Sequence, residues 1–409
     1  AGGVPTTAAC LALYHRRCYQ PAQIERAYGL LPLYARGLDG RGRTVVIVVS
    51  YGSPTIEHDL HVFDRTFGLP DPNLAVLQPA GPVPAYDAHD PNRLAAAAEA
   101  SLDVEWAHAV APGARIVLVE TPTFESEGVA GFPDIVRAER YVIDHGIADV
   151  INESFGATEQ TFPDVGALLG LRAAEKDARG HGVTIVAASG DQGATNLEND
   201  LKTLFPYRTT LWPASDPLVT AVGGTSLQLD GSGNRLAPDT VWHSPPEAGI
   251  ASGGGGGVSS IFPRPGFQAG VRDVVGGHRG IPDVSLSAAW DGQVDVYCTS
   301  PGGPGGWTTL YGTSEAAPLF SGMVAIADQL AGRRLGLLGP TLYRLGAEHA
   351  PGIVDVTQGD NSTTALVPGR PPVTVPGYAA GPGYDLASGL GTVEASHLVP
   401  ELAGVPSLS

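Results

Sequence analysis

The sequence has little lysine, few cysteines and no long apolar run. Its two lysines, Lys176 and Lys202, lie outside any recognisable catalytic motif, which argues against a Ser–Lys hydrolase. No run of about 18 apolar residues occurs, so we expect no membrane-spanning helix and no membrane partner. A charged start followed by an apolar core is also missing, and we expect any export signal to have been removed already.

Positive charge is scarce as well. The 409 residues include 24 Lys and Arg against 42 Asp and Glu, which gives a formal net charge of −18 at pH 7. A surface of this sign repels phosphate groups, so nucleic acid is not an expected partner. The composition also favours tolerance of acid, because few cations remain to repel one another at low pH.

The three cysteines are Cys10, Cys18 and Cys298. Cys10 and Cys18 are near enough in sequence to close a short loop, and in an oxidising compartment that bridge would contribute roughly 2–3 kcal/mol. Cys298 would then be left over and buried. The alternative is three free thiols in a cytosolic protein.

Apolar residues make up 43% of the chain, and its 55 glycines and 35 prolines are typical of tight turns and long structured loops. Strands buried on both faces are predicted at 44–50, 114–120, 148–152, 183–188 and, more weakly, 218–222. Helices are predicted at 24–35, 91–110, 133–144, 165–179 and 316–330. The alternation predicts a single α/β domain over 1–409, with a mostly parallel sheet, helices on both faces and a loop-rich C-terminal part.

Between 227 and 307 this pattern gives way to Gly, Pro and Ser. The run at 253–257 consists of glycine alone. It predicts either a flexible linker or a backbone strip that accepts an extended peptide.

A candidate nucleophile lies in the stretch 310–318, Leu-Tyr-Gly-Thr-Ser-Glu-Ala-Ala-Pro. The small-residue turn places Ser314 at the N-terminus of an apolar helix, with Pro318 in its first turn. Unpaired N–H groups and the helix dipole favour a developing negative charge there. A serine so placed can act as a nucleophile if a base removes its proton. The alternative is that Ser314 only caps the helix.

The helix predicted over 91–110 carries two carboxylates one turn apart. At about 100° per residue, Glu99 and Asp103 share a face with Trp106, whereas His108 points to the opposite side. Like charges at this spacing repel, and burial makes ionising both harder. The pair should therefore share a proton and titrate as a unit. The alternative is a solvated acidic face.

A further carboxylate, Asp191, follows the predicted strand at 183–188 directly, in Ser-Gly-Asp-Gln-Gly at 189–193. Sites on open parallel sheets collect in the turns beyond the carboxyl ends of the strands. The alternative is a turn aspartate that bonds its own backbone.

Together, Glu-x-x-x-Asp at 99–103, Ser-Gly-Asp-Gln-Gly at 189–193 and Gly-Thr-Ser-Glu-Ala-Ala-Pro at 312–318 resemble the motifs of the sedolisins, the serine-carboxyl peptidases. These enzymes are subtilisin-like in fold and use glutamate where subtilisins use histidine. The resemblance covers nearly the whole chain, with further matches at 51–56, 262–265 and 381–391. It implies a secreted, extracellular, acid-acting endopeptidase that cleaves proteins or peptides through an acyl-enzyme.

The resemblance implies a role for each residue. Ser314 would be the nucleophile, Glu99 the general base, and Asp103 the residue that holds and tunes Glu99. Asp191 would stand in the oxyanion hole, where a carboxyl can donate a hydrogen bond only when it is protonated. This requirement, together with a carboxylate as the base, explains why such a site would work in acid. Glu315 follows the serine where smaller or apolar residues are usual in subtilisin-like enzymes.

The family also carries a calcium ion near the C-terminus. Asp355 and Asp385 match its carboxylate ligands, and the carbonyls of Val356, Gly381 and Gly383 match its backbone ligands. Its long N-terminal propeptide, expected to act as a folding aid and inhibitor, is not in this chain. We therefore expect the mature form, as a monomer.

Three other functions remain open. The chain could be a tripeptidyl-peptidase of the same family, or a non-catalytic, calcium-stabilised binding homologue on the same fold. An ordinary Ser–His–Asp peptidase would need a suitably placed histidine. His108 faces away from the carboxylates, and His58 and His61 form only a weak metal-like pair.

Overall fold

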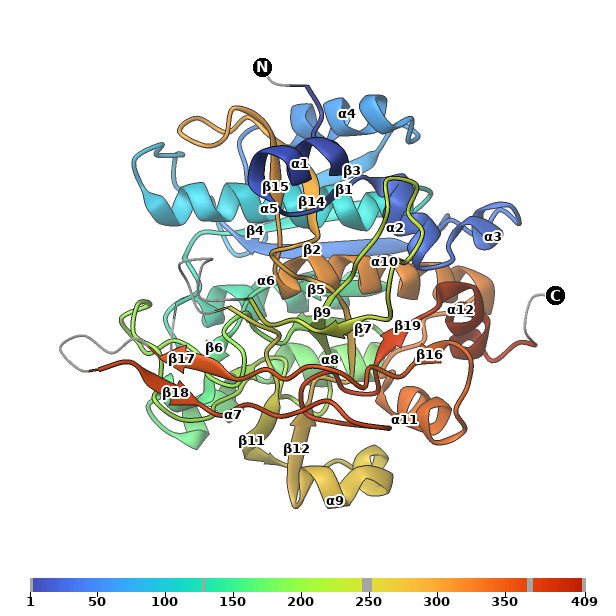
Figure 1. Cartoon of the computed structure of the whole chain (residues 1–409). Helices are drawn as coiled ribbons and strands as arrows, with labels where there is room; N and C mark the ends of the chain where they lie inside the picture. The colour runs from blue at the N-terminus through green and yellow to red at the C-terminus, as the bar shows by residue number, and fades with distance from the viewer. Residues whose placement is uncertain (1–2, 127–128, 245–251, 366–370, 407–409) are drawn as a thin grey trace.

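The computed structural model describes residues 3–126, 129–244, 252–365 and 371–406. An eight-stranded sheet runs through the centre of the molecule (Figure 1). Its path follows β10 (Thr240–Val241), β9 (Thr220–Ser226), β7 (Thr184–Ala188), β5 (Val150–Glu153), β2 (Thr44–Ser50), β4 (Arg115–Thr121) and β3 (Asn73–Leu77), with β13 (Val284–Ser287) also paired to β9. Every pairing is parallel except β10 with β9. The prediction of a mostly parallel sheet is confirmed.

Strand β2 shows why the sheet needs helices on both faces. Val45, Ile47 and Val49 belong to one buried cluster, and Val46 and Val48 belong to another. The first cluster includes α5 (Pro91–Val110) and α10 (Thr313–Ala331), and the second includes α6 (Phe132–Asp144) and α8 (Ala173–His181). An uninterrupted β-branched run is therefore buried on both sides, as expected for a central parallel strand.

The remaining elements surround this core. The other helices are α1 (Thr7–Tyr14), α2 (Pro21–Ala27), α3 (Leu31–Tyr34), α4 (Ile56–Phe67), α7 (Val165–Leu171), α9 (Arg272–Val275), α11 (Gly339–Ala347) and α12 (Ala395–Ala403). The other strands are β1 (Cys18–Tyr19), β6 (Ala157–Thr158), β8 (Leu211–Trp212), β11 (Gly257–Pro263), β12 (His278–Ile281), β14 (Gln293–Cys298), β15 (Gly306–Leu310), β16 (Ile353–Val354), β17 (Thr363–Ala365), β18 (Val373–Val375) and β19 (Thr392–Val393). Within the described ranges, no helix is both long and apolar enough to cross a membrane.

Two predicted helices are each broken in two. The helix expected at 24–35 is interrupted at Gly29, which has a φ of 70° and packs so closely on Glu394 that a side chain would not fit. The helix expected at 165–179 is interrupted at Arg172, whose guanidinium pairs with the buried Asp216. Tertiary contacts thus decide where these helices end.

The stretch 227–307 has more regular structure than its composition predicts. Strand β13 extends the central sheet, and β14 pairs with both β1 and β15 in a second sheet. These strands are short, and glycines and prolines separate them, so the sequence pattern hides them. Helix α4 and strand β3 were also missed.

The glycine run at 253–257 is neither a linker nor a free strip for a peptide. The backbone N–H groups of Gly253, Gly254 and Gly255 donate to carbonyls of the protein, and their own carbonyls accept hydrogen bonds from protein groups. A Cβ on Gly255 would meet the carbonyl oxygen of Ser189 at 2.2 Å. The run is therefore a close-packed brace under the turn at 189–193, and only glycine permits that approach.

The cysteines behave as expected from their spacing. Cys10 and Cys18 form a disulfide, and Cys298 is a buried free thiol. The disulfide joins α1 to β1, which pairs in parallel with β14. The N-terminal segment is thus fixed to the second sheet.

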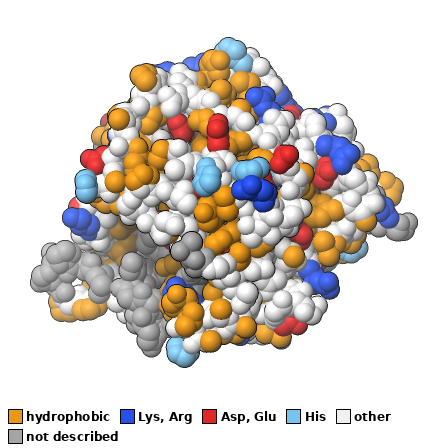
Figure 2. Space-filling model, turned by 90° about the horizontal axis from the view of Figure 1, so that it is seen from above, with side chains coloured by type: hydrophobic (Ala, Val, Ile, Leu, Met, Phe, Trp, Pro, Cys, Tyr) orange, Lys and Arg blue, Asp and Glu red, His pale blue; other side chains and the backbone are white. Residues whose placement is uncertain are grey.

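Much of the acidic excess lies inside the protein. On the face seen in Figure 2, acidic and basic side chains are interspersed among polar and hydrophobic ones. Buried acidic residues include Asp59, Asp64, Asp103, Glu105, Glu139, Glu153, Glu175, Asp295, Glu315 and Asp328. Among the described residues, the arginines buried to the same degree are Arg93 and Arg279. Many carboxyls are therefore buried without a compensating cation, which favours their protonated form.

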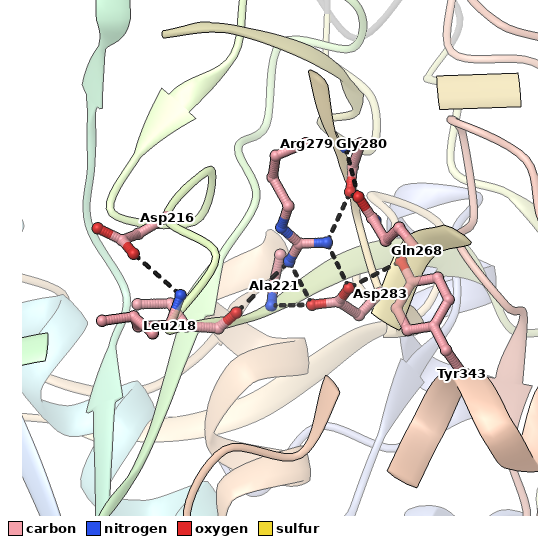
Figure 3. A network of polar contacts seen from close by, with 9 residues as sticks. Asp216, Leu218, Ala221, Gln268, Arg279, Gly280, Asp283 and Tyr343 are labelled. Carbon is pink, nitrogen blue, oxygen red and sulfur yellow. Dashed lines mark hydrogen bonds and ion pairs between the residues drawn. The ribbon is translucent and has the colours of Figure 1, made fainter. Parts of the chain in front are cut away.

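One buried ion pair is complete. Arg279 donates from both terminal nitrogens to the carboxylate of Asp283, at 2.6 Å each (Figure 3). Asp283 also accepts from the Ala221 backbone N–H at 2.9 Å and from the Tyr343 hydroxyl at 2.9 Å. This pair ties β9 to the segment before β13 and to α11.

Candidate active site

Helix α5 presents its carboxylates as predicted. Asp103 is fully buried and Glu99 is partly buried, on a helix whose start is capped by Asp90. His108 points elsewhere, with its Nε2 3.2 Å from the Pro70 carbonyl and 3.4 Å from Asp64. The alternative interpretation, a solvent-exposed acidic face, is therefore wrong. His108 does not contact Glu99 or Asp103.

Ser314 is the second residue of α10, whose N-cap is Gly312. Its hydroxyl lies near enough to Glu99 to lower the pKa of that carboxyl, and its Oγ lies 3.5 Å from the Ser154 carbonyl oxygen. The helix begins earlier than predicted, so Pro318 is its sixth residue rather than part of the first turn. The helix start and the carboxylate of α5 thus meet at Ser314.

Asp191 is bound to the start of α10. Its Oδ1 accepts from the backbone N–H and from the hydroxyl of Thr313, both at 2.7 Å. Its Oδ2 would lie 2.6 Å from a Cβ on Gly312, where φ is 130°. The carboxyl therefore reaches across to the residues before Ser314 instead of closing its own turn, and Gly312 leaves room for it.

Sequence reasoning missed Ser154, which connects the two sides of the site. Its Oγ donates to Asp103 Oδ1 at 2.7 Å, and the side-chain amide of Asn152 donates to that same Oγ at 3.0 Å. Asn152 in turn accepts from Ser321 on α10 at 3.0 Å. This chain of hydrogen bonds fixes Asp103 relative to both β5 and α10.

Burial dominates the electrostatics. It raises the pKa of Glu99 to about 8, an increase that the hydrogen bond from Ser314 opposes and the charges of Asp191 and Glu125 reinforce. Burial and the charge of Glu99 raise the pKa of Asp103 well above its usual range. Burial also raises the pKa of Asp191, against the two bonds from Thr313. The carboxyls therefore hold protons more strongly than free side chains do.

Glu315 lies next to Ser314 but away from solvent. Its side chain is fully buried, and burial raises its pKa well above the usual range. A buried carboxyl of this kind is uncharged. Glu315 is thus part of the core and does not contact a substrate in the cleft.

The five residues expected at a calcium ion gather in one loop region. Asp355 accepts from the Gly383 N–H at 2.8 Å, and Asp385 accepts from the Gly381 N–H at 3.1 Å. The Val356 carbonyl lies 3.4 Å from the Ser388 hydroxyl, which also bonds Asp385. No group of three or more His, Cys, Asp and Glu that could hold a metal occurs within the described ranges, so a cation here would need backbone carbonyls. Two carboxylates with carbonyl oxygens fit calcium.

Several known proteins are similar to this chain in sequence. The family model described as the subtilase family matches residues 92–336. Kumamolisin of Bacillus sp. (strain MN-32) is 32% identical, over 96% of this chain and 64% of its own length. Tripeptidyl-peptidase 1 of Homo sapiens is 32% identical, over 53% of this chain and 36% of its own length.

Structural comparison agrees with this relationship. The solved structure of Pseudomonas sedolisin, a serine-carboxyl proteinase complexed with pseudo-iodotyrostatin, superposes with a TM-score of 0.78 at 26% identity. The match covers 95% of this chain and 99% of that one. The present chain spans less than two thirds of the length of the curated relatives named above.

Proposed function

This chain belongs to the subtilase family and, within it, to the sedolisins, and on that premise we propose that it is an acid-acting serine-carboxyl endopeptidase. The observation that carries the proposal is the packing of α5 against α10, which brings the Ser314 hydroxyl near enough to Glu99 to act on its pKa. Asp191 is bound at the same helix start. A nucleophile, a base and a polar group for the oxyanion thus stand together.

Each step uses a residue already in place. Glu99 takes the Ser314 proton as Oγ attacks the peptide carbonyl, and the resulting oxyanion is stabilised by protonated Asp191. The intermediate collapses when Glu99 returns the proton to the departing amine, which leaves an ester on Ser314. Water, deprotonated by Glu99, then hydrolyses this ester. Asp103, held by Ser154, positions Glu99 throughout.

The pH range follows from two opposed requirements. Glu99 must be ionised to act as the base, whereas Asp191 must be protonated to donate to the oxyanion. Because burial raises the pKa of Asp191, its donor form persists to higher pH than that of an ordinary aspartate. Activity should fall once Asp191 ionises, which supports action in acid; because the pKa of Glu99 is also raised, a minor ionised fraction of Glu99 would supply the base there.

We also propose a calcium ion held by Asp355, Asp385 and the carbonyls of Val356, Gly381 and Gly383. When bound, the cation would neutralise the two carboxylates and fix the loop that carries them. It would contribute to stability and take no part in the reaction. An oxidising, extracellular setting is supported by the disulfide between Cys10 and Cys18.

The test is hydrolysis of internally quenched peptides across acid and neutral pH. Ser314→Ala should abolish cleavage and keep the fold, whereas Ser232→Ala, in an exposed turn, should leave the rate unchanged. Retained cleavage in Ser314→Ala would end this proposal. Absence of cleavage by the parent chain at every pH would instead favour the calcium-stabilised binding homologue, and a rate maximum near pH 8 that persists in Glu99→Gln would favour a histidine base.

A tripeptidyl-peptidase is the second candidate, because human tripeptidyl-peptidase 1 is 32% identical over 53% of the chain. Acetylated and free forms of one peptide separate the two activities. An enzyme that removes tripeptides requires the free amino terminus and stops when it is acetylated. Internal cleavage continues on the acetylated peptide.

A further inference from the structure

A carboxyl that the sequence did not single out lies beside the proposed base. Glu125 follows β4, and its side chain turns back onto Ser50 at the end of β2. The Ser50 hydroxyl donates to the Glu125 carboxylate, and the Glu125 backbone N–H donates to the Ser50 Oγ at 2.9 Å. This reciprocal pair fixes Glu125 to the carboxyl end of the sheet, although the two residues are 75 positions apart.

Glu125 and Glu99 line the same cavity. Its volume is about 100 Å³, and its walls include Phe124, Phe155 and Ser154. Glu99 Oε1 is buried and has no hydrogen-bond partner. Two carboxyls therefore share a small space with largely apolar walls, in which their charges act on each other more strongly than in bulk water.

Every ionisable group that acts on Glu99 is acidic. Asp103 comes from the same helix, Asp191 from the turn after β7, and Glu125 from the segment after β4. Ser314 contributes a neutral hydroxyl, and no cation among the described residues acts on Glu99. The charge of Glu99 is thus set by which of its acidic neighbours carry protons.

We propose that Glu125 is a positioning residue for the base Glu99. Ser50 holds the Glu125 carboxyl at the cavity that it shares with Glu99, and from there the charge of Glu125 controls how readily Glu99 becomes ionised. This inference rests on the proposed function, since it assigns Glu125 an influence on that reaction. Glu125 itself exchanges no proton with the substrate.

The direction of the effect follows from the negative charge that Glu125 carries when it is ionised. Burial raises the pKa of Glu125 to about 7 and that of Glu99 to about 8. Once Glu125 is ionised, its negative charge holds the proton on Glu99 more strongly. Without this charge, Glu99 would ionise at lower pH, and its base form would be more abundant at the pH values where Glu125 is ionised in the parent chain.

The test is Glu125→Gln, which keeps the shape and removes the charge. The acidic limb of kcat/KM should move to lower pH by about one unit, at the low end of what one nearby charge does to a carboxyl. Ser50→Ala should cause a smaller shift in the same direction, because its hydroxyl helps Glu125 to ionise. Glu120→Gln is the matched control, since Glu120 lies near the end of β4 but bonds Gln78 outside this cavity, and it should cause no shift.

A second readout does not depend on activity. The ¹³C resonance of the Glu99 carboxyl, titrated in Ser314→Ala with and without Glu125→Gln, should show the same downward shift. Superimposable titrations would overturn the inference even if the enzyme is a peptidase. A rise in KM with no shift in the acidic limb of the kcat/KM profile would also overturn the inference, because that result would make Glu125 a substrate contact. If Glu125→Gln does not fold, the Ser50→Ala titration decides.

Discussion

Replacing Glu139 by glutamine is expected to reduce the loss of stability on going from acid to neutral pH. Glu139 on α6 is 2% exposed and hydrogen-bonds to Glu153 at the end of β5. The charges of Glu175 and Asp216 also act on Glu153. Arg172, a cation that acts on Glu175, is already paired with Asp216. The cluster therefore holds together only while some of its carboxyls keep their protons.

The magnitude follows from the pKa of Glu139. Burial raises it from its ordinary value of 4.5 to about 7 in the folded protein. Below pH 4.5 the group is protonated in both states, so its favourable contribution is fully present. As the pH rises towards 7, the unfolded chain releases the proton and the folded protein retains it, which favours unfolding. At about 1.4 kcal/mol per pH unit, the loss from this group is roughly 3 kcal/mol.

Urea unfolding at pH values of about 4, 5.5 and 7.5 measures the contribution of Glu139 to the pH dependence of the free energy of unfolding. The free energy of unfolding should fall less steeply with pH in Glu139→Gln, by roughly 3 kcal/mol over the range. Asp144→Asn is the matched control, because Asp144 ends the same helix in an exposed position. Equal pH dependence in the parent chain and in Glu139→Gln would refute the reasoning, as would an equal effect of the control.

Three further predictions concern the site and the loops. In Asp191→Asn the side-chain amide can donate a hydrogen bond to the oxyanion at every pH, so the alkaline fall in kcat should move to higher pH. Asp191→Ala should lower kcat by about 10²–10³-fold, and steady-state rates across pH check both predictions. Gly312→Ala would have to hold a φ of 130° with its Cβ 2.6 Å from Asp191 Oδ2, so it should lose roughly 1–3 kcal/mol in thermal melts, together with most activity. Chelation should lower Tm and added Ca²⁺ should restore it, and a melt unchanged by chelation would exclude the ion held by Asp355 and Asp385.

The central sheet was predictable because its strands are continuous apolar runs that are buried on both faces. The carboxylates of α5 were predictable for a similar reason, since a helix of regular period places residues 99 and 103 on one face. The family motifs then identified Ser314 and Asp191, and the structure brings these residues together. Local patterns of this kind need no knowledge of the rest of the fold.

What the sequence concealed depends on contacts between distant segments. Ser154 bonds Asp103, 51 positions away, and Ser50 holds Glu125, 75 positions away. Neither serine has a local signal that separates it from a surface serine. The buried cluster around Glu153 was hidden for the same reason, because nothing near each glutamate shows that the others face it. The strands β13 to β15 were missed because their partners lie elsewhere in the chain.

The position of Glu153 next to Ser154 has a consequence for mutagenesis. Glu153 belongs to the acidic cluster between β5, α6 and α8, whereas Ser154 holds Asp103 and faces Ser314. A backbone displacement caused by either substitution will reach the other, so their effects are not expected to add. A double-mutant cycle on Glu153→Gln and Ser154→Ala would measure this interdependence, and rate constants from either variant alone report on both environments at once.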